Sequence, residues 1–137
     1  MERIVIFTNG CFDIIHHGHI AYLNEAKSLG DYLVVGLNSD SSVKQLKGND
    51  RPINNEQDRK FVLENIKAVD EVIIFSEETP LSLIKKIRPN VLVKGGDWAE
   101  NQIIGADFVK SIGGQVKSLK FIDGPSTTKI IEKIKDK

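Results

Sequence analysis

Three histidines lie in one short polar segment, His16, His17 and His19, with Gly18 between the last two. His16 and His19 stand where an apolar-periodic segment begins, so both imidazoles should flank the first turn of a helix. The backbone amides of such a turn point outward and its dipole favours an anion, while Gly18 has no Cβ to keep a phosphate away. Imidazoles donate hydrogen bonds to phosphate oxygens. The spacing therefore indicates a site that stabilises negative charge on a phosphoryl group during transfer.

Other interpretations of these histidines stay open at this point. They could be an incidental cluster of surface or core side chains. They could also belong to a zinc site, because His16, His19, Asp13 and Cys11 include possible zinc ligands, although the spacing is not that of a His-Glu-x-x-His helix and Gly18 has no use there. A dehydrogenase is disfavoured because no Gly-x-Gly-x-x-Gly turn follows the first predicted strand. We therefore predict no metal ion bound directly by side chains.

The composition predicts one soluble domain over residues 1–137. Hydrophobic residues make up 40% of the chain, enough for one core. Lys plus Arg equals Asp plus Glu, at 19 each, which argues against nucleic-acid and membrane-surface partners. Cys11 is the only cysteine, so an internal disulfide is excluded and a reducing, cytoplasmic location is expected. No apolar run reaches the length of a signal peptide or a membrane span.

Strand-like and helix-like segments alternate along the chain. Short apolar runs predict strands at residues 4–8, 32–37, 71–75 and 91–93, and residues 115–119, which follow Gly113-Gly114, are predicted as a fifth strand. Periodic or capped segments predict helices at residues 19–29, 39–46, 55–69, 80–88, 102–112 and 126–134. This order predicts an α/β fold, a Rossmann-like doubly wound five-stranded parallel sheet with helices on both faces. Ligands of such sheets bind beyond the carboxyl ends of the strands, where the strand order reverses.

The sequence also predicts caps and core-facing side chains for some of these helices. Gly30 is expected to cap the C-terminus of the first helix, and Asn55 to cap the third together with Asp58. Apolar spacing predicts side chains that face the core; those in the third and last helices are Val62, Ile66, Val69, Ile130, Ile131 and Ile134.

The segment Gly10-Cys11-Phe12-Asp13-Ile14-Ile15-His16-His17-Gly18-His19 resembles the G-x-F-D-x-x-H-x-G-H signature of the cytidylyltransferase-like nucleotidyltransferases. Residues 30–40 resemble the second strand of that family, and residues 124–128 its C-terminal Ser-Thr-Thr motif. The likeness covers essentially the whole chain. It implies a reaction in which a phosphate oxygen of the acceptor attacks the α-phosphorus of a nucleotide and pyrophosphate leaves.

Within that family, residues 47–48, 51–53, 58–59 and 93–97 resemble the D-glycero-D-manno-heptose 1-phosphate adenylyltransferases, a domain that many bacteria fuse behind a sugar kinase. The likeness implies ATP and a sugar 1-phosphate as substrates and Mg²⁺ held mainly by the nucleotide phosphates. It also implies a homodimer and a separate sugar kinase. Glycerol-3-phosphate cytidylyltransferases are an alternative, but they usually carry an arginine before the Ser-Thr motif, and residues 121–127 contain none. A guanylyl-transferring relative and a non-catalytic nucleotide-binding module are further alternatives.

The motif and the resemblance together assign roles to individual residues. The residues expected to act on the reacting phosphates are His16, His19, Lys47 and Arg59. Those expected to bind the nucleotide are Asn9, Gly10, Cys11, Phe12, Asp13, Gly18, Gly95, Asp97, Ser126, Thr127 and Thr128. Those expected to bind the acceptor are Lys44, Lys94 and Trp98. For three of these positions a purely structural role is an open alternative: Asp13 as a loop brace, Trp98 as packing, and Ser126 to Thr128 as ordinary helix caps.

Overall fold

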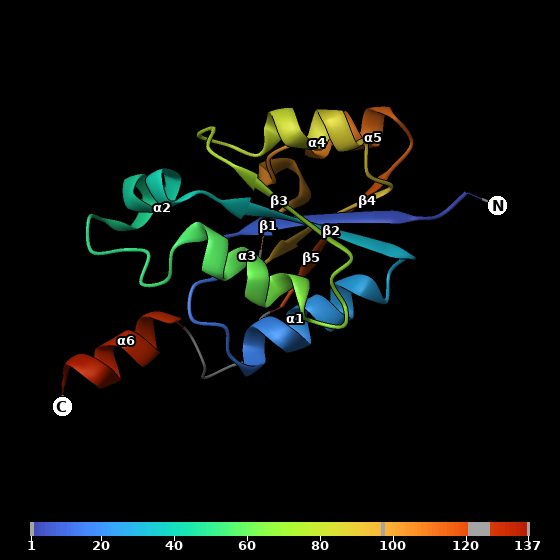
Figure 1. Ribbon diagram of the computed structural model, residues 1–137. Helices are drawn as coiled ribbons and strands as arrows, with labels where there is room; N and C mark the ends of the chain where they lie inside the picture. Colours follow the sequence, from blue (N-terminus) through green and yellow to red (C-terminus); the bar gives the residue numbers. More distant parts are fainter. Residues whose placement is uncertain (1, 97, 121–126, 137) are drawn as a thin grey trace.

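Five parallel strands form the centre of the computed structural model, which describes residues 2–96, 98–120 and 127–136 (Figure 1). In chain order they are β1 (Val5–Gly10), β2 (Tyr32–Asn38), β3 (Glu71–Phe75), β4 (Val91–Gly95) and β5 (Gln115–Leu119). In space their order is β3-β2-β1-β4-β5. The chain thus moves outward from β1 to β3, returns to the other side of β1 and continues to β5. This reversal between β1 and β4 is where a parallel sheet binds its ligand.

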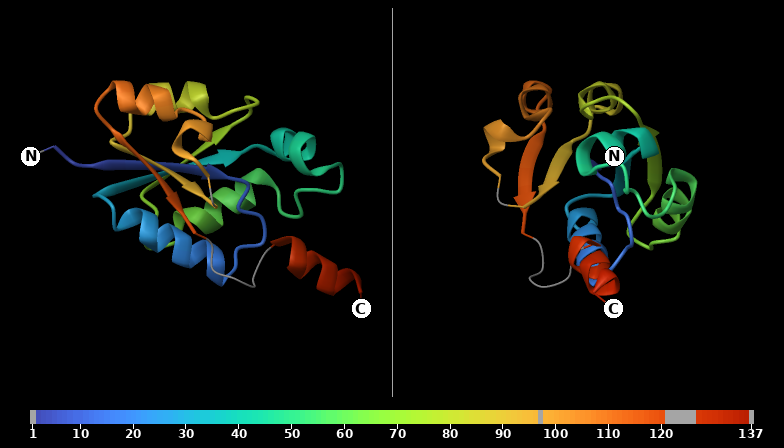
Figure 2. Two further views of the ribbon diagram at one scale, coloured as in Figure 1. Left: turned by 180° about the vertical axis from the view of Figure 1, so that it is seen from behind. Right: turned by 90° about the vertical axis from the view of Figure 1, so that its left-hand side faces the viewer.

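Helices cover both faces of the sheet, as the two views of Figure 2 show. The helical elements are α1 (His17–Lys27), α2 (Asp40–Lys47), α3 (Glu56–Glu64), α4 (Leu81–Ile87), the short 3-10 helix η1 (Glu100–Gln102), α5 (Ala106–Ser111) and α6 (Thr127–Lys135). α1 and α3 lie on one face, and α4 and α5 on the other (Figures 1 and 2). The predicted doubly wound fold is confirmed. Within the described ranges, no helix combines the length and apolar character that crossing a membrane requires.

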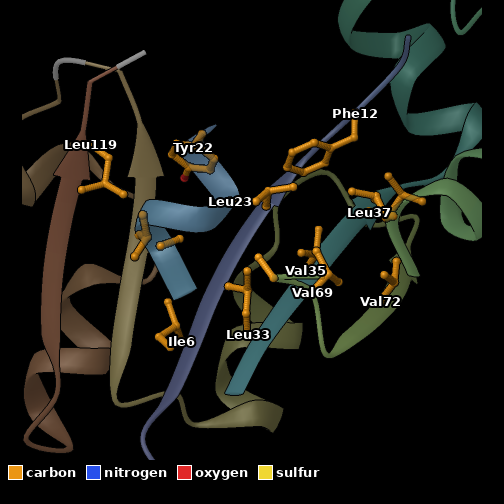
Figure 3. Packing of buried hydrophobic residues seen from close by; sticks show 14 of the residues in the cluster. Ile6, Phe12, Tyr22, Leu23, Leu33, Val35, Leu37, Val69, Val72 and Leu119 are labelled. Carbon is orange, nitrogen blue, oxygen red and sulfur yellow. The ribbon is translucent and has the colours of Figure 1, made fainter. Parts of the chain in front are cut away.

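The core has two parts because each strand sends alternate side chains to opposite faces. On one face Ile6, Leu33 and Val35 pack with Leu23 of α1 (Figure 3). On the other, Phe7 packs with Ile84 of α4 and with a cluster that includes Val34, Leu92 and Val109. Burial on both faces explains why β1, β2 and β4 begin as continuous apolar runs rather than alternating ones.

The third predicted helix is shorter than expected and faces differently. α3 ends at Glu64 instead of residue 69, although its predicted cap is confirmed, since Asn55 accepts a hydrogen bond from the Asp58 amide. The prediction that Val62 faces the core is wrong, because 44% of this residue is exposed. Leu63 and Arg59, one helical turn apart, are the buried residues of α3.

Three other helix details also differ from the predictions. The predicted helix at residues 102–112 is divided into η1 and α5, because Gly105 has φ +90°, outside helical geometry. α1 ends at Lys27 and its C-cap is Ser28, not Gly30; a Cβ at Gly30 would lie 2.6 Å from Ile6 Cδ1, so close packing is what requires glycine there. α6 forms as predicted but none of its residues is buried, and its Ile134 is 66% exposed.

Candidate active site

A cavity of about 860 Å³ opens beyond the carboxyl ends of the central strands. Its floor is formed where these strands end, by Asn9 and Gly10 of β1, Asn38 of β2, Phe75 of β3 and Lys94 of β4. The loop between β1 and α1 and the first residues of α6 form further walls. The cavity therefore lies at the reversal of strand order, as the fold predicts.

The loop between β1 and α1 is held in an unusual backbone conformation. Phe12 and Ile14 have φ of 46° and 50°, in the left-handed region that residues with a side chain rarely occupy. Asp13 lies between them and is 2% exposed. Its carboxylate accepts hydrogen bonds from the amides of Ile53 (2.6 Å) and Asn54 (3.0 Å). Strain of this kind persists only where the surroundings fix the backbone, and these bonds fix it.

Asp13 therefore connects three segments that are distant in sequence. Its side chain holds the loop between α2 and α3, and its carbonyl oxygen accepts a 2.6 Å hydrogen bond from the Thr127 hydroxyl at the start of α6. Both carboxylate oxygens are occupied by backbone amides, so the geometry favours the loop-brace interpretation of Asp13. A magnesium ion at this site would need its ligands from phosphate oxygens and water, as was expected from the resemblance.

Arg59 is a second structural tie beside the same loop. Its side chain is 1% exposed and donates to the carbonyl oxygens of Cys11, Asn38 and Asn54 over 2.8–2.9 Å. Its Nη2 also lies 2.8 Å from Oδ1 of Asp40. Arg59 is not among the residues that line the cavity. The structure thus gives it a positioning role, because it joins the ends of β1 and β2 to α3 rather than facing a phosphate.

His16 and His19 form a reciprocal cap at the start of α1. Nδ1 of His16 accepts from the Gly18 amide, and Nδ1 of His19 accepts from the His16 amide, both at 3.1 Å. Since both Nδ1 atoms are acceptors, each neutral ring carries its proton on Nε2. Both side chains line the cavity. The site therefore holds two Nε2–H donors fixed in advance by the helix, while the Gly18 amide, expected to face a phosphate, is used by His16.

The environment keeps both imidazoles neutral near pH 7. Burial, together with a smaller effect of the neighbouring His16, lowers the pKa of His19 to about 4. Burial also lowers the pKa of His16, with a smaller effect from His17. The two ring centroids are 4.0 Å apart, so two positive rings would repel each other. The rings can therefore act as hydrogen-bond donors without first taking up a proton.

Cationic side chains on two walls of the cavity favour phosphate. Lys47, at the end of α2, and Lys94, at the end of β4, both line it as predicted. Arg51 lines it too, although the sequence analysis gave it no role. Its side chain is 13% exposed, its Nε has no hydrogen-bond partner among the described residues, and it lies 3.9 Å from Asp13 Oδ2. A buried guanidinium nitrogen without a partner is costly, so this group is available for an anion.

Lys94, Trp98 and Cys11 surround another part of the cavity. Burial lowers the pKa of Lys94, an effect opposed by Cys11 and reinforced by Lys47. The ammonium group lies 5.6 Å from the centre of the Trp98 ring, and Trp98 Nε1 donates to the Gly95 carbonyl over 3.0 Å. Burial raises the pKa of the Cys11 thiol, against the opposing effect of nearby cations, so this thiol is a poor nucleophile. The geometry fits direct phosphoryl transfer without a covalent intermediate on the protein.

The structure brings most of the predicted site residues to one cavity. Those that line it are Asn9, Gly10, Cys11, Phe12, Asp13, His16, Gly18, His19, Lys47, Lys94, Gly95, Trp98, Thr127 and Thr128. Lys44 and Arg59 do not line it, and Asp97 and Ser126 lie outside the described residues. The lining residues that the sequence analysis did not assign to the site are Tyr22, Asn38, Leu46, Arg51, Phe75, Glu78, Thr79, Pro80, Gly96 and Ile104. Arg51 shares a charged segment with Lys47, which was the available signal for it.

The histidine cap, the strand order and the cavity are together typical of a known family, and residues 7–133 match its description, Cytidylyltransferase-like. The chain belongs to this family. No group of three or more His, Cys, Asp or Glu residues in the described ranges is arranged to hold a metal ion. The bonds at both Nδ1 atoms and at both Asp13 oxygens instead give these groups a structural use within the family's nucleotide site.

The curated proteins similar to this chain include two named bifunctional protein HldE. The one from Campylobacter concisus is 57% identical over 135 residues, and the one from Aliarcobacter butzleri is 54% identical over 136 residues. The alignments cover 98–99% of this chain but only 28% of either relative. The chain thus spans little more than a quarter of the length of these relatives.

Two solved structures support the fold. The lipopolysaccharide core biosynthesis protein from Thermoplasma volcanium matches with a TM-score of 0.72 and 29% identity, over 90% of this chain and 100% of that one. The pantothenate synthetase from Thermus thermophilus matches with a TM-score of 0.56 and 15% identity, over 90% of this chain and 57% of that one. The second likeness shows a shared fold alone.

Proposed function

We propose that this chain is a nucleotidyltransferase that transfers AMP from ATP to D-glycero-D-manno-heptose 1-phosphate. The observation that carries the proposal is the reciprocal cap, which places two neutral Nε2–H donors on the cavity. The choice of heptose and adenine rests on the sequence resemblance, and it is supported by relatives named HldE and by a solved relative named for lipopolysaccharide core biosynthesis. The product would be a nucleotide-activated heptose for surface glycans.

The reaction needs little covalent work from the protein. An oxygen of the sugar 1-phosphate attacks the α-phosphorus of ATP, the new P–O bond forms, and the bond to the β-phosphate oxygen breaks to release pyrophosphate. His16 and His19 donate to the oxygens of the α-phosphate, where negative charge grows in the transition state. Lys47, Lys94 and Arg51 supply positive charge for the remaining phosphates. Mg²⁺, bound mainly through the nucleotide phosphates, would neutralise negative charge on them, so EDTA should abolish turnover.

Pyrophosphate release from ATP, CTP and GTP, each offered with heptose 1-phosphate or glycerol 3-phosphate, tests the proposal. We expect turnover with ATP and heptose 1-phosphate. Turnover only with CTP and glycerol 3-phosphate would replace it with the cytidylyl alternative, and turnover with GTP would change the base. Nucleotide binding without pyrophosphate release for any acceptor would favour a non-catalytic module. A homodimer, a cytoplasmic location and an upstream sugar kinase are also proposed, and light scattering tests the first.

A further inference from the structure

Two carboxylates line the cavity among the described residues, and they differ in whether they bond to other residues of the protein. The carboxylate of Asp13 is buried and bonded to two backbone amides. Glu78 is exposed in the connection between β3 and α4, lines the cavity, and has no hydrogen bond or ion pair to another residue in the described part of the chain. A free carboxylate in a cavity that also carries Lys47, Lys94 and Arg51 is out of place for binding phosphate, because it repels one.

Glu78 and the histidine pair follow two strands that are not neighbours in the sheet. It follows β3, while the histidines follow β1, and β2 lies between these strands. Neighbouring strands are about 4.8 Å apart, so the two strand ends are separated by about 10 Å. The α4 side of the sheet, to which the chain turns after Glu78, is also opposite to the α1 side (Figures 1 and 2). Such a separation leaves room for a sugar between the reacting phosphate and this carboxylate.

The surroundings of Glu78 fit a sugar better than a nucleoside. Thr79 and Pro80 beside it line the same wall, as does the buried ring of Phe75. Hydroxyl groups of a sugar donate to a carboxylate, and its C–H surfaces pack on apolar side chains. Lys47 and Arg51 come from the chain that follows β2, the neighbour of β3. Cations of this segment can hold the phosphate of the acceptor while Glu78 accepts from its hydroxyl groups, which is the pattern of a sugar phosphate.

We infer that Glu78 determines acceptor specificity by accepting hydrogen bonds from hydroxyl groups of the acceptor sugar. The inference rests on the proposed function and names the part of the cavity that holds the sugar. Gly95 at the end of β4 and Thr127 at the start of α6 line other parts of the cavity and are left for the nucleoside. Glu78 touches the substrate away from the reacting atoms, so it contributes to binding of the acceptor and not to the chemical step.

The test compares Glu78→Ala and Glu78→Gln with Glu77→Ala, which removes the adjacent exposed carboxylate that does not line the cavity. Steady-state assays with heptose 1-phosphate and ATP give KM for each substrate. We expect Glu78→Ala to raise KM for heptose 1-phosphate about 10–100-fold, because a hydrogen bond to a charged group is lost. Glu78→Gln should have a smaller effect. KM for ATP, and every parameter of Glu77→Ala, should be unchanged.

A second readout separates sugar recognition from a general disturbance of the site. Methyl phosphate has the phosphate group but no hydroxyl, so its inhibition constant against heptose 1-phosphate should be the same in wild type and in Glu78→Ala. An unchanged KM for heptose 1-phosphate, or a rise in KM for ATP alone, would overturn the inference while leaving the proposed function intact. If the wild type neither binds nor uses heptose 1-phosphate, the proposed function fails and the inference fails with it.

Discussion

The backbone amide of His16 donates to Nδ1 of His19 over 3.1 Å, and the two ring centroids are 4.0 Å apart. The two nitrogens of His19 therefore have different roles. Nδ1 caps the helix, and Nε2–H is left to donate to the substrate. Asparagine places an acceptor near the position of Nδ1 but has nothing at the position of Nε2. We predict that His19→Asn lowers kcat about 10²–10³-fold, the usual cost of losing one fixed donor, with little loss of stability.

His17→Asn is the matched control for this substitution. His17 is exposed on the same turn and does not line the cavity, so its replacement should leave kcat unchanged. His19→Ala removes both the cap and the donor, and it should lower the free energy of unfolding as well as kcat, by about 1 kcal/mol for the cap. Wild-type turnover in His19→Asn would show that Nε2 does not act on the phosphate.

The pH dependence of stability follows from the lowered pKa values of the two rings. An unfolded histidine has its usual pKa near 6.5, whereas His19 in the fold has a pKa of about 4. Between these values the unfolded chain binds more protons than the folded one, so stability is present above pH 6.5 and is lost as pH falls toward 4. Urea titrations at pH 7, 5.5 and 4.5 should show this decline. It should be weaker in His19→Asn, and an equal decline in both proteins would contradict the assignment.

The strands could be predicted from sequence because the sheet buries both faces. β3 has the predicted bounds because Val72 to Phe75 form a short apolar run, which in a small domain is most readily buried as a strand of the sheet. β5 also has the predicted bounds, although only Val116 and Leu119 of this edge strand are buried. The register of α3 could not be predicted. Residues 61–63 are all apolar, so the local pattern allows several inward faces. The buried Arg59 selects one of them, through bonds to carbonyl groups of β1 and β2 that no local pattern encodes.

Contacts between residues far apart in the sequence also limit what can be predicted about the site. The place of His16 and His19 at the start of a helix could be predicted because the motif is local, but the hydrogen bonds by which they cap it were not predicted. The sequence left the use of Asp13 as a brace as one of two alternatives, because the partners that decide it are 40 and 41 positions away. Arg51 and Glu78 are charged residues in polar connections, and only the folded chain shows that they line the cavity.

Arg59 should matter for stability more than for binding. Arg59→Met removes a buried cation that donates to three carbonyl oxygens and to Asp40, and leaves those acceptors without their donor. We predict a loss of about 3–5 kcal/mol in the free energy of unfolding, measured by urea titration. Lys67→Met, which removes an exposed cation beyond the end of α3, should change it by less than about 0.5 kcal/mol. A fully stable Arg59→Met protein would contradict the positioning role.

Arg51 should show the opposite behaviour, because its Nε has no hydrogen-bond partner in the described structure and the nearest carboxylate oxygen is 3.9 Å away. Arg51→Met keeps most of the packing of the side chain, and the ion pair to Asp13 that it removes is long and has no hydrogen bond, so the free energy of unfolding should fall by no more than about 1 kcal/mol. If this guanidinium binds a substrate phosphate, kcat/KM should fall about 10–100-fold, since charged hydrogen bonds of this kind contribute about 1.5–3 kcal/mol. Lys85→Met removes an exposed cation of α4 outside the cavity and should leave both quantities unchanged. Unfolding and steady-state assays on the same preparations check the prediction, and a loss of stability without a loss of kcat/KM would show that Arg51 only braces the loop around Asp13.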